Sequence, residues 1–198
     1  MERVFLVRHA ETAANILELV QGVFDSELSE KGIRQAKALG EALGKEKIGC
    51  VYASDSGRAR ETMRESLLEG KFKVVYAKEL RERNYGVLEN KAWHALSEEE
   101  SKIYKSHDLR PDGGESIGDL SARVIPFFNK MILESHESIM VLTHHNVISA
   151  MSCFLMGMPL EKWRAFRTDN CSISEFYYRD GVWRIKRVND TCHLNGVD

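Results

Sequence analysis

Residues 4–12 read VFLVRHAET, and this stretch indicates the type of fold that the rest of the chain follows. Four apolar residues in a row, 4–7, fit a strand buried on both faces, as in a parallel sheet covered by helices. Arg8 and His9 come directly after it. Open α/β sheets bind their ligands beyond the carboxyl ends of the strands. The opening residues therefore predict both a sheet core and a site at one edge of it.

The alternation of strand and helix continues along the chain. Further short strands are predicted at 50–53, 74–77 and 139–142. Helices are predicted from an N-cap at Ser29 to Leu43, after Ser56 with Met63, Leu67 and Leu68 facing inward, over 116–134 with a kink or break at Pro126, and over 147–156. This order favours a mostly parallel sheet with helices on both faces.

The end of the chain has a different pattern. Two strand-like runs, 173–178 and 182–188, are separated by a turn that contains Asp180 and Gly181. Asp-Gly between such runs is typical of a β-hairpin. The predicted fold is thus an α/β three-layer sandwich, with a mostly parallel mixed sheet, helices on both faces and an antiparallel edge hairpin. Residues 1–198 are expected to form one domain, with a short helical insertion at about 90–112 and a helix near 92–104.

Composition excludes several classes of protein. With 198 residues, 43% of them hydrophobic, and a net charge of -2, the chain has the balance of an ordinary globular domain. A near-neutral charge gives no electrostatic footprint for nucleic acid or an anionic membrane, and no apolar run approaches a membrane span. None of the four cysteines forms a C-x-x-C pair. We expect a cytoplasmic protein with reduced thiols and no metal.

Chemically capable residues follow each predicted parallel strand. Arg8 and His9 follow the first strand, Arg58 comes shortly after the second, Glu82 after the third, and His144 after the fourth. The carboxyl ends of parallel strands share one edge of the sheet, so these side chains are expected to meet there.

This set of residue types suits phosphoryl transfer. A transferring phosphoryl group spreads negative charge over its oxygens, so catalysis is mostly positioning and charge stabilisation. Arginine binds two phosphate oxygens at once, a neutral imidazole can carry phosphate transiently, and a carboxyl group can protonate the departing oxygen. With arginines and a second histidine to neutralise the charge, the scheme requires neither a metal nor a cofactor.

Several segments, in order along the chain, resemble the histidine phosphatase superfamily, the phosphoglycerate mutase-like enzymes. The opening LVRHAET (6–12) is similar to that family's Arg-His-Gly signature, with Ala10 in place of glycine. The resemblance continues at QGVFD (21–25), LSEKG (28–32), SDSGRARET (54–62), LRERNYG (80–86), GGES (113–116), THHN (143–146), NCSI (170–173) and NDTCHL (189–194). It spans almost the whole chain and is strongest to the phosphatase branch, which includes broad-specificity and alpha-ribazole phosphatases.

The resemblance implies a role for each matching residue. His9 would be phosphorylated, Arg8, Arg58 and His144 would form the phosphate pocket, and Glu82 would be the proton donor. The other residues that it implies for phosphate or substrate binding are Thr12, Asn15, Gln21, Gly22, Tyr85 and His145.

The chain departs from the family pattern at a few positions. Asp55 and Ser56 stand where the family usually has proline and leucine, a change expected to affect the turn and not the chemistry. His145 replaces a common glycine and is expected to crowd or line the pocket. A metal site formed by His144 and His145 is disfavoured, because adjacent residues at a strand end point to opposite sides. The other histidines, His94, His107, His136 and His193, are expected to be ordinary surface or packing residues.

Three functions fit these residues. The chain is expected to hydrolyse a phosphate monoester of a small phosphorylated metabolite through a phosphohistidine. It could instead be a phosphoglycerate mutase, or a non-catalytic phosphate-binding regulator. Mutases of the resembled family carry a longer insertion with a pair of adjacent arginines for the substrate carboxylate. In 90–112 no two basic residues are adjacent, and three successive glutamates, 98–100, would repel an acid substrate. The mutase is therefore disfavoured. The expected partner is a small phosphorylated metabolite, and a homodimer through an edge strand is an open alternative to a monomer.

Overall fold

The structure is a computed structural model, and residues 3–134 and 138–197 are described. His136 therefore lies outside the described residues. Six strands form one mixed sheet, in the order β3-β2-β4-β1-β5-β6. Strands β1, β2, β3 and β4 are parallel, β5 runs antiparallel to β1, and β6 runs antiparallel to β5. The predicted mostly parallel sheet with an antiparallel edge hairpin is confirmed.

The strands and helices lie close to their predicted positions. The strands are β1 (Arg3–Arg8), β2 (Cys50–Ser54), β3 (Val74–Ala77), β4 (Ile139–Thr143), β5 (Ile173–Arg179) and β6 (Val182–Asp190). The α-helices are α1 (Ala13–Ile16), α2 (Glu30–Leu43), α3 (Gly57–Glu65), α4 (Glu98–Lys105), α5 (Ile117–Glu134) and α6 (His145–Leu155). Short 3-10 turns link several of them. Ser29 caps α2 as expected, with its side chain accepting the Gly32 N–H. Pro126 lies inside helix α5, which continues to Glu134, so the helix does not break at this proline.

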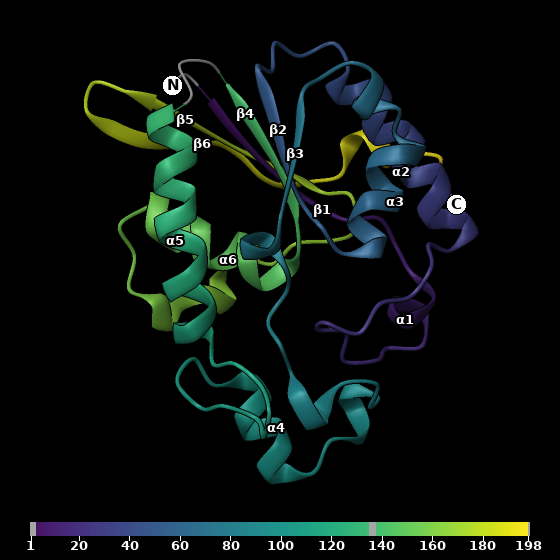
Figure 1. The fold of residues 1–198 in the computed structure, drawn as a ribbon, viewed down its shortest axis with the longest axis vertical. Coiled ribbons are helices and arrows are strands. Elements are labelled where there is room, and N and C mark those ends of the chain that lie inside the picture. The colour runs from purple at the N-terminus through teal and green to yellow at the C-terminus, as the bar shows by residue number, and fades with distance from the viewer. Residues whose placement is uncertain (1–2, 135–137, 198) are drawn as a thin grey trace.

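Side chains of β1 alternate between two apolar layers. Phe5 and Val7 pack with α2 and α3, while Val4 and Leu6 pack with α5 and α6. Figure 1 shows these two pairs of helices on opposite faces of the sheet. Because both faces are covered, β1 is apolar at successive positions and not only at every second one. The buried β1 and β4 then direct the residues that follow them toward one edge of the sheet.

The prediction that Leu67 faces inward is wrong. Leu67 was expected to face the core, but it is 73% exposed. Helix α3 ends at Glu65, and Leu67 adopts a left-handed conformation with φ of 58°. The chain therefore turns before Leu67 can follow the helical spacing of Met63, whereas Leu68 beyond the turn is buried as expected.

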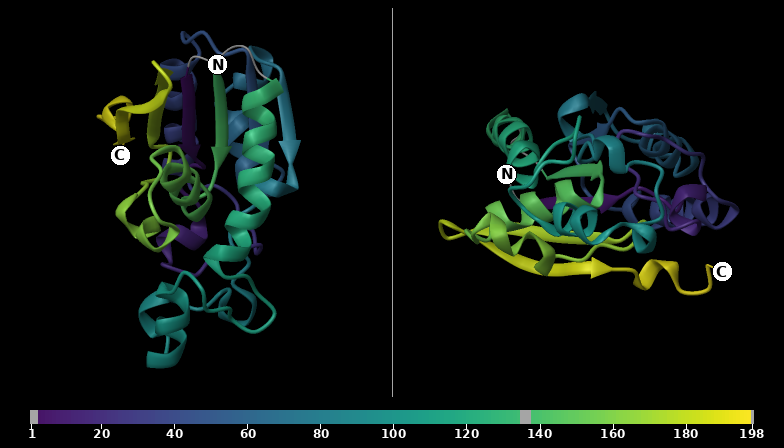
Figure 2. Two further views of the ribbon diagram at one scale, coloured as in Figure 1. Left: turned by 90° about the vertical axis from the view of Figure 1, so that its left-hand side faces the viewer. Right: turned by 90° about the horizontal axis from the view of Figure 1, so that it is seen from below.

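The insertion covers the carboxyl edge of the sheet. Figures 1 and 2 show the segment that contains α4 set apart from the sheet, beyond the ends of the parallel strands. The predicted helix near 92–104 is divided: a 3-10 turn spans Trp93–Ala95 and α4 begins only after Ser97. Ser97 and Glu100 form a capping box, and this local hydrogen bonding fixes the start of α4.

The insertion is anchored by one buried arginine. Arg83 is fully buried, and its guanidinium donates to the carbonyls of Glu115 (2.6 Å), Tyr104 (3.1 Å), Leu109 (3.0 Å) and Ile103 (3.4 Å). These carbonyls lie in and after α4. A single side chain thus holds the insertion against the segment that carries Glu82.

Replacing Arg83 by leucine is expected to destabilise the protein by about 3 kcal/mol, because four carbonyls around this fully buried side chain lose a charged donor. Arg81→Leu is the matched control: Arg81 is 46% exposed and pairs with Asp55 at the surface. That change should cost less than about 1 kcal/mol. Urea unfolding of both variants measures the difference. Equal losses would show that Arg83 does not anchor the insertion.

Candidate active site

The residues that follow β1 and β4 meet beside each other. His9 lies one residue beyond β1, and its backbone N–H donates to the Thr143 carbonyl at the end of β4 (2.9 Å). Its ring lies 5.1 Å from the ring of His144, centroid to centroid, at 57°. Parallel pairing of Arg8 with Thr143 fixes this arrangement. The two histidines expected in the site therefore stand side by side.

His9 is held in one tautomer. Its Nδ1 lies 2.8 Å from the carbonyl oxygen of Ala10, which can only accept, so Nδ1 carries the proton. Nε2 then carries the lone pair, as a nucleophile requires. Burial and the positive charges of Arg58 and Arg8 hold the pKa of His9 well below its ordinary value. The imidazole is therefore neutral at neutral pH.

His144 binds Arg58. Its Nδ1 lies 3.1 Å from Nη2 of Arg58, and since a guanidinium only donates, Nδ1 accepts and Nε2 is protonated. Nε2 donates to the Ser54 hydroxyl at 2.9 Å. The Ser56 hydroxyl lies 3.4 Å from the same nitrogen, so this departure from the family pattern adjoins a site residue and does not affect the turn alone. Burial, Arg58 and His9 keep the pKa of His144 well below its ordinary value.

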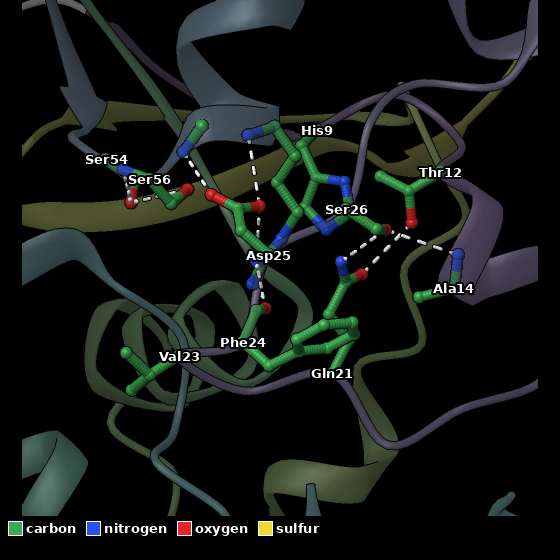
Figure 3. Close-up of polar contacts among 12 residues, drawn as sticks. His9, Thr12, Ala14, Gln21, Val23, Phe24, Asp25, Ser26, Ser54 and Ser56 are labelled. Atoms are coloured by element: carbon green, nitrogen blue, oxygen red, sulfur yellow. Dashed lines mark hydrogen bonds and ion pairs between the residues drawn. The ribbon is translucent and has the colours of Figure 1, made fainter. Parts of the chain in front are cut away.

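Arg58 is fixed by the loop at 21–26. Its guanidinium donates to the carbonyls of Gly22 (2.9 Å) and Phe24 (3.0 Å) and to Oδ1 of Asp25 (3.1 Å). Asp25 also accepts the backbone N–H groups of Gly57 and Arg58, at the start of α3. Figure 3 shows Asp25 and Phe24 from this loop converging on α3. One carboxylate thus caps the helix and orients the arginine that the helix carries.

A second carboxylate holds the same loop from the other side. Glu89 accepts the N–H groups of Val23 (2.8 Å), Phe24 (2.6 Å) and Tyr85 (3.0 Å). Gly22 lies so close to Glu89 that an added Cβ would stand 2.2 Å from its Oε1. The site therefore needs glycine at position 22 for close packing. Sequence reasoning missed the parts played by Asp25 and Glu89.

Glu82 lies on the wall of the site. It is 6% exposed, and its carboxylate accepts the backbone N–H groups of Arg83 (2.8 Å) and Asn146 (3.2 Å). Arg123 donates to its carbonyl. The carboxylate is thus held by the neighbouring residue and by Asn146 from a distant segment, while Arg123 holds the backbone of Glu82.

Arg8 has one free buried donor. Its Nη1 donates to the Thr168 carbonyl at 2.7 Å, but its Nε is buried without a partner among the described residues. The Nε of Arg58 is likewise buried and unpartnered there. Unsatisfied buried donors are costly, which favours an anionic ligand beside them. Burial lowers the pKa of both guanidinium groups, yet arginine stays charged in proteins.

A cavity of about 440 Å³ opens in front of His9. Its lining includes Arg8, His9, Asn15, Gln21, Glu82, Tyr85 and His145 of the predicted site, together with Leu19, Val20, Trp93, Tyr104, Asn146, Arg167, Thr168 and Asp169. Arg58, His144, Thr12 and Gly22 do not line it. His144 lies beside His9 and binds Arg58, and Gly22 meets Arg58 through its carbonyl.

Thr12 supports the residues that do line the cavity. It is fully buried, caps α1, and its hydroxyl lies 3.1 Å from the side-chain oxygens of both Asn15 and Gln21. Gln21 in turn donates to Ser26 at 2.9 Å, as Figure 3 shows. Tyr85 is 4% exposed and accepts a hydrogen bond from the Asn146 amide at 2.9 Å. Thr12 therefore contacts other site residues and not the cavity.

The buried histidines make stability depend on pH. Burial, with Arg8 next in effect, lowers the pKa of His145 to about 3. In the unfolded chain the same group binds a proton near pH ~6.5. Below that value the unfolded state binds more protons, so stability decreases as the pH falls.

Between pH 7.5 and 5.5 we expect His145 to contribute a loss of about 1.3 kcal/mol, with His9 and His144 acting in the same direction. Urea unfolding of the wild type and of His145→Gln at the two pH values measures this. The variant should lose less stability than the wild type on acidification. An identical loss in both would contradict a neutral, buried His145.

With this geometry described, the chain can be placed among known proteins. The family model "Histidine phosphatase superfamily (branch 1)" matches residues 4–191. The protein belongs to that superfamily. Among the described residues, no three histidine, cysteine, aspartate or glutamate side chains are grouped as metal ligands. Nor does any helix there have the length and apolar character needed to cross a membrane.

The proteins that this chain resembles are named as a mutase or as phosphatases. The probable phosphoglycerate mutase GpmB of Yersinia pestis is 31% identical, over 98% of this chain and 96% of that protein. The alpha-ribazole phosphatase of Shigella flexneri is 28% identical, with a TM-score of 0.85 over 95% of this chain and 96% of that one. A mycobacterial glucosyl-3-phosphoglycerate phosphatase is 26% identical, with a TM-score of 0.86 over 96% and 99%.

Proposed function

We propose that this protein hydrolyses phosphate monoesters of small metabolites through a phosphohistidine at His9. The observation that carries the proposal is the tautomer of His9: Nδ1 donates to Ala10, so Nε2 keeps its lone pair beside the cavity. A low pKa keeps that lone pair free at neutral pH. The similar solved structures of two phosphatases, from Shigella flexneri and a mycobacterium, support the same class of reaction.

The first step transfers the phosphoryl group. Nε2 of His9 attacks phosphorus, and the bond from phosphorus to the alcohol oxygen breaks. That oxygen takes a proton from the carboxylic acid form of Glu82 and leaves as the alcohol. The unpartnered donors of Arg8 and Arg58 stabilise the charge on the phosphoryl oxygens.

The second step regenerates the enzyme. Glu82, now a carboxylate, takes a proton from a water molecule whose oxygen attacks the phosphorus. The bond between phosphorus and Nε2 breaks, and phosphate leaves. We assign His144 no acid role: its Nδ1 accepts from Arg58 and its Nε2 donates to Ser54, so it orients that arginine.

A mutase is the second candidate, because the Yersinia relative carries that name. It would need a cation for the carboxylate of phosphoglycerate. Among the described residues of the insertion, only Trp93 and Tyr104 line the cavity, so none of its lysines or arginines does. Lys91 pairs with Glu100, and Arg110 pairs with Asp119. Outside the insertion, Arg167 also lines the cavity, where it pairs with Asp169 at 3.3 Å. We favour the hydrolase because the insertion supplies no cation to the cavity. A screen of phosphorylated metabolites for phosphate release, with 3-phosphoglycerate isomerisation assayed in parallel, separates the two.

Turnover is expected to be independent of metal, because Arg8 and Arg58 supply the positive charge that a metal would otherwise provide. Incubation with a chelator, followed by removal of the chelator–metal complex, should leave kcat and KM for p-nitrophenyl phosphate unchanged. Activity that disappears on chelation and returns with a divalent cation would contradict this scheme.

A further inference from the structure

The guanidinium of Arg8 depends on one backbone carbonyl for its position. Its Nη1 donates to the Thr168 carbonyl at 2.7 Å, and this is its only hydrogen bond to the described residues. Arg8 lines the cavity together with His9, and its Nε is buried without a partner there. Whatever fixes the Thr168 carbonyl therefore fixes the guanidinium that we expect to bind phosphate.

The peptide group that carries this carbonyl is also bound at its other edge. The N–H of Asp169 belongs to the same peptide group, and it donates to Oδ1 of Asn189 at 2.6 Å. Because a trans peptide group is planar, its N–H and C=O point in opposite directions and turn together. Asn189 and Arg8 thus bind opposite edges of one rigid peptide group.

The side-chain amide of Asn189 makes a two-point contact with Asp169. Besides accepting the Asp169 N–H, it donates through Nδ2 to Oδ2 of the Asp169 carboxylate at 2.8 Å. A backbone N–H only donates and a carboxylate only accepts, so the amide binds in a single orientation. Two contacts on one residue resist rotation of its backbone, and the Thr168 carbonyl is held with it.

Asn189 is itself anchored to the sheet. It lies near the end of β6 with a φ of 52°, a left-handed conformation that asparagine adopts more readily than most residues. Its backbone N–H donates at 3.0 Å to the hydroxyl of Ser174, which is 1% exposed and lies opposite Leu6 of β1. The sheet that ends in Arg8 therefore also supports the residue that holds the peptide group beside Arg8.

The backbone around Arg8 has further support that does not involve Asn189. The Asn170 amide and the Cys171 N–H both donate to the His9 carbonyl, at 3.1 and 3.2 Å. These contacts remain when the Asn189 side chain is removed, so the path of the chain should be kept. The effect of such a change should fall on the direction of the Arg8 guanidinium.

We propose that Asn189 is a positioning residue, which fixes the peptide group between Thr168 and Asp169 and through it directs Arg8 at the phosphoryl group. The inference rests on the phosphate-binding part that the proposed function gives to Arg8. Asn189 does not line the cavity, so its effect on phosphate passes through Arg8. It also gives a role to the first residue of the segment NDTCHL (189–194), to which sequence reasoning assigned none.

Binding of inorganic phosphate, measured by isothermal titration calorimetry, tests the proposal without requiring turnover. Asn189→Gly suits the left-handed backbone and removes both side-chain hydrogen bonds. We expect it to weaken phosphate binding by about tenfold, and to lower kcat/KM for p-nitrophenyl phosphate by about tenfold or more, because Arg8 is no longer held in direction. Asp180→Gly is the matched control: Asp180 is also left-handed, with φ of 55°, but lies in the β5–β6 turn and is 72% exposed. It should bind phosphate as the wild type does.

Arg8→Lys distinguishes a positioning role from a general loss of structure. Lysine carries its charge as a point on a flexible stem and has no planar fork to be directed. In the Arg8→Lys background, Asn189→Gly should therefore change the dissociation constant of phosphate by less than about twofold. Thermal unfolding checks that each variant is folded.

Asn189→Asp is a second variant, which decides the question if Asn189→Gly does not fold. Aspartate also tolerates the left-handed backbone, but it has no donor and places a second carboxylate against that of Asp169. We expect a loss of phosphate affinity at least equal to that of Asn189→Gly, and again less than about twofold in the Arg8→Lys background.

Three results would overturn the proposal: equal losses in the two backgrounds, wild-type phosphate affinity in a folded Asn189→Gly variant, or no phosphate binding by the wild type. The fate of the hydrolase is read separately. Phosphate binding that shows the expected dependence on Asn189 and Arg8, in a protein that releases phosphate from no ester, would support the positioning role and refute the hydrolase.

Discussion

Replacing His9 by alanine is expected to reduce kcat/KM by roughly 10⁴-fold or more, because removing a covalent nucleophile leaves only binding and charge stabilisation. The fold should survive the change. The backbone N–H and carbonyl of His9 bond to Thr143 and Cys171, and these contacts do not involve the ring. The ring makes one hydrogen bond, to Ala10.

The measurement is phosphate release by purified His9→Ala, with circular dichroism and thermal unfolding as checks on the fold. His107→Ala is the matched control, since His107 is a half-exposed histidine that does not line the cavity. It should keep wild-type rates. A folded His9→Ala variant with wild-type turnover would rule out the covalent route.

Glu82→Gln is expected to separate substrates by leaving group. Formation of the phosphoenzyme from an alkyl phosphate should slow by about 10²–10⁴-fold, because the alkoxide leaves without a proton. An activated aryl phosphate, whose leaving group needs no proton, should lose less than about tenfold in the same step. Glutamine keeps one oxygen that can accept from Arg83 or Asn146 and loses the acceptor of the other N–H, so thermal unfolding is measured alongside.

Single-turnover rapid quench measures this step for both substrates. The comparison of leaving groups within one variant is its own control, because a general distortion of the site would slow both equally. Equal losses would therefore contradict a proton-donor role for Glu82.

Local sequence patterns predicted most of the fold. The buried run 4–7, the Ser29 cap and the Asp180–Gly181 turn each act through nearby residues, and all three occur where expected. Leu67 was predicted wrongly, because the end of α3 depends on a left-handed turn that helical spacing does not reveal. The divided helix in the insertion has a similar cause, since its start is set by the cap at Ser97.

The site was predicted less completely than the fold. Strand order brings His9 and His144 together, and this could be expected from their positions after parallel strands. Asp25 and Glu89 could not be found in this way. Both act on backbone N–H groups of distant segments, and such contacts leave no characteristic spacing in the sequence. The same holds for Thr168, whose carbonyl orients Arg8.

The contacts of Arg58 bear on its expected part in the site. Sequence resemblance implied that Arg58 and His144 surround the phosphate with Arg8, and this stays a prediction. In the structure Arg58 and His144 bind each other, and Arg58 additionally binds Gly22, Phe24 and Asp25. Only its Nε is unpartnered. The part that Arg58 plays toward phosphate therefore depends on that one donor, or on exchange of its present partners.

The most direct test of the account is to trap the phosphoenzyme in Glu82→Gln. With p-nitrophenyl phosphate, this variant should form phosphohistidine readily and hydrolyse it slowly, since the base for water is missing. We predict a burst of about one nitrophenolate per active site, with acid-labile phosphate mapped by mass spectrometry to the peptide that contains His9. A variant that turns over without a burst, or that carries its phosphate on another residue, would contradict the account.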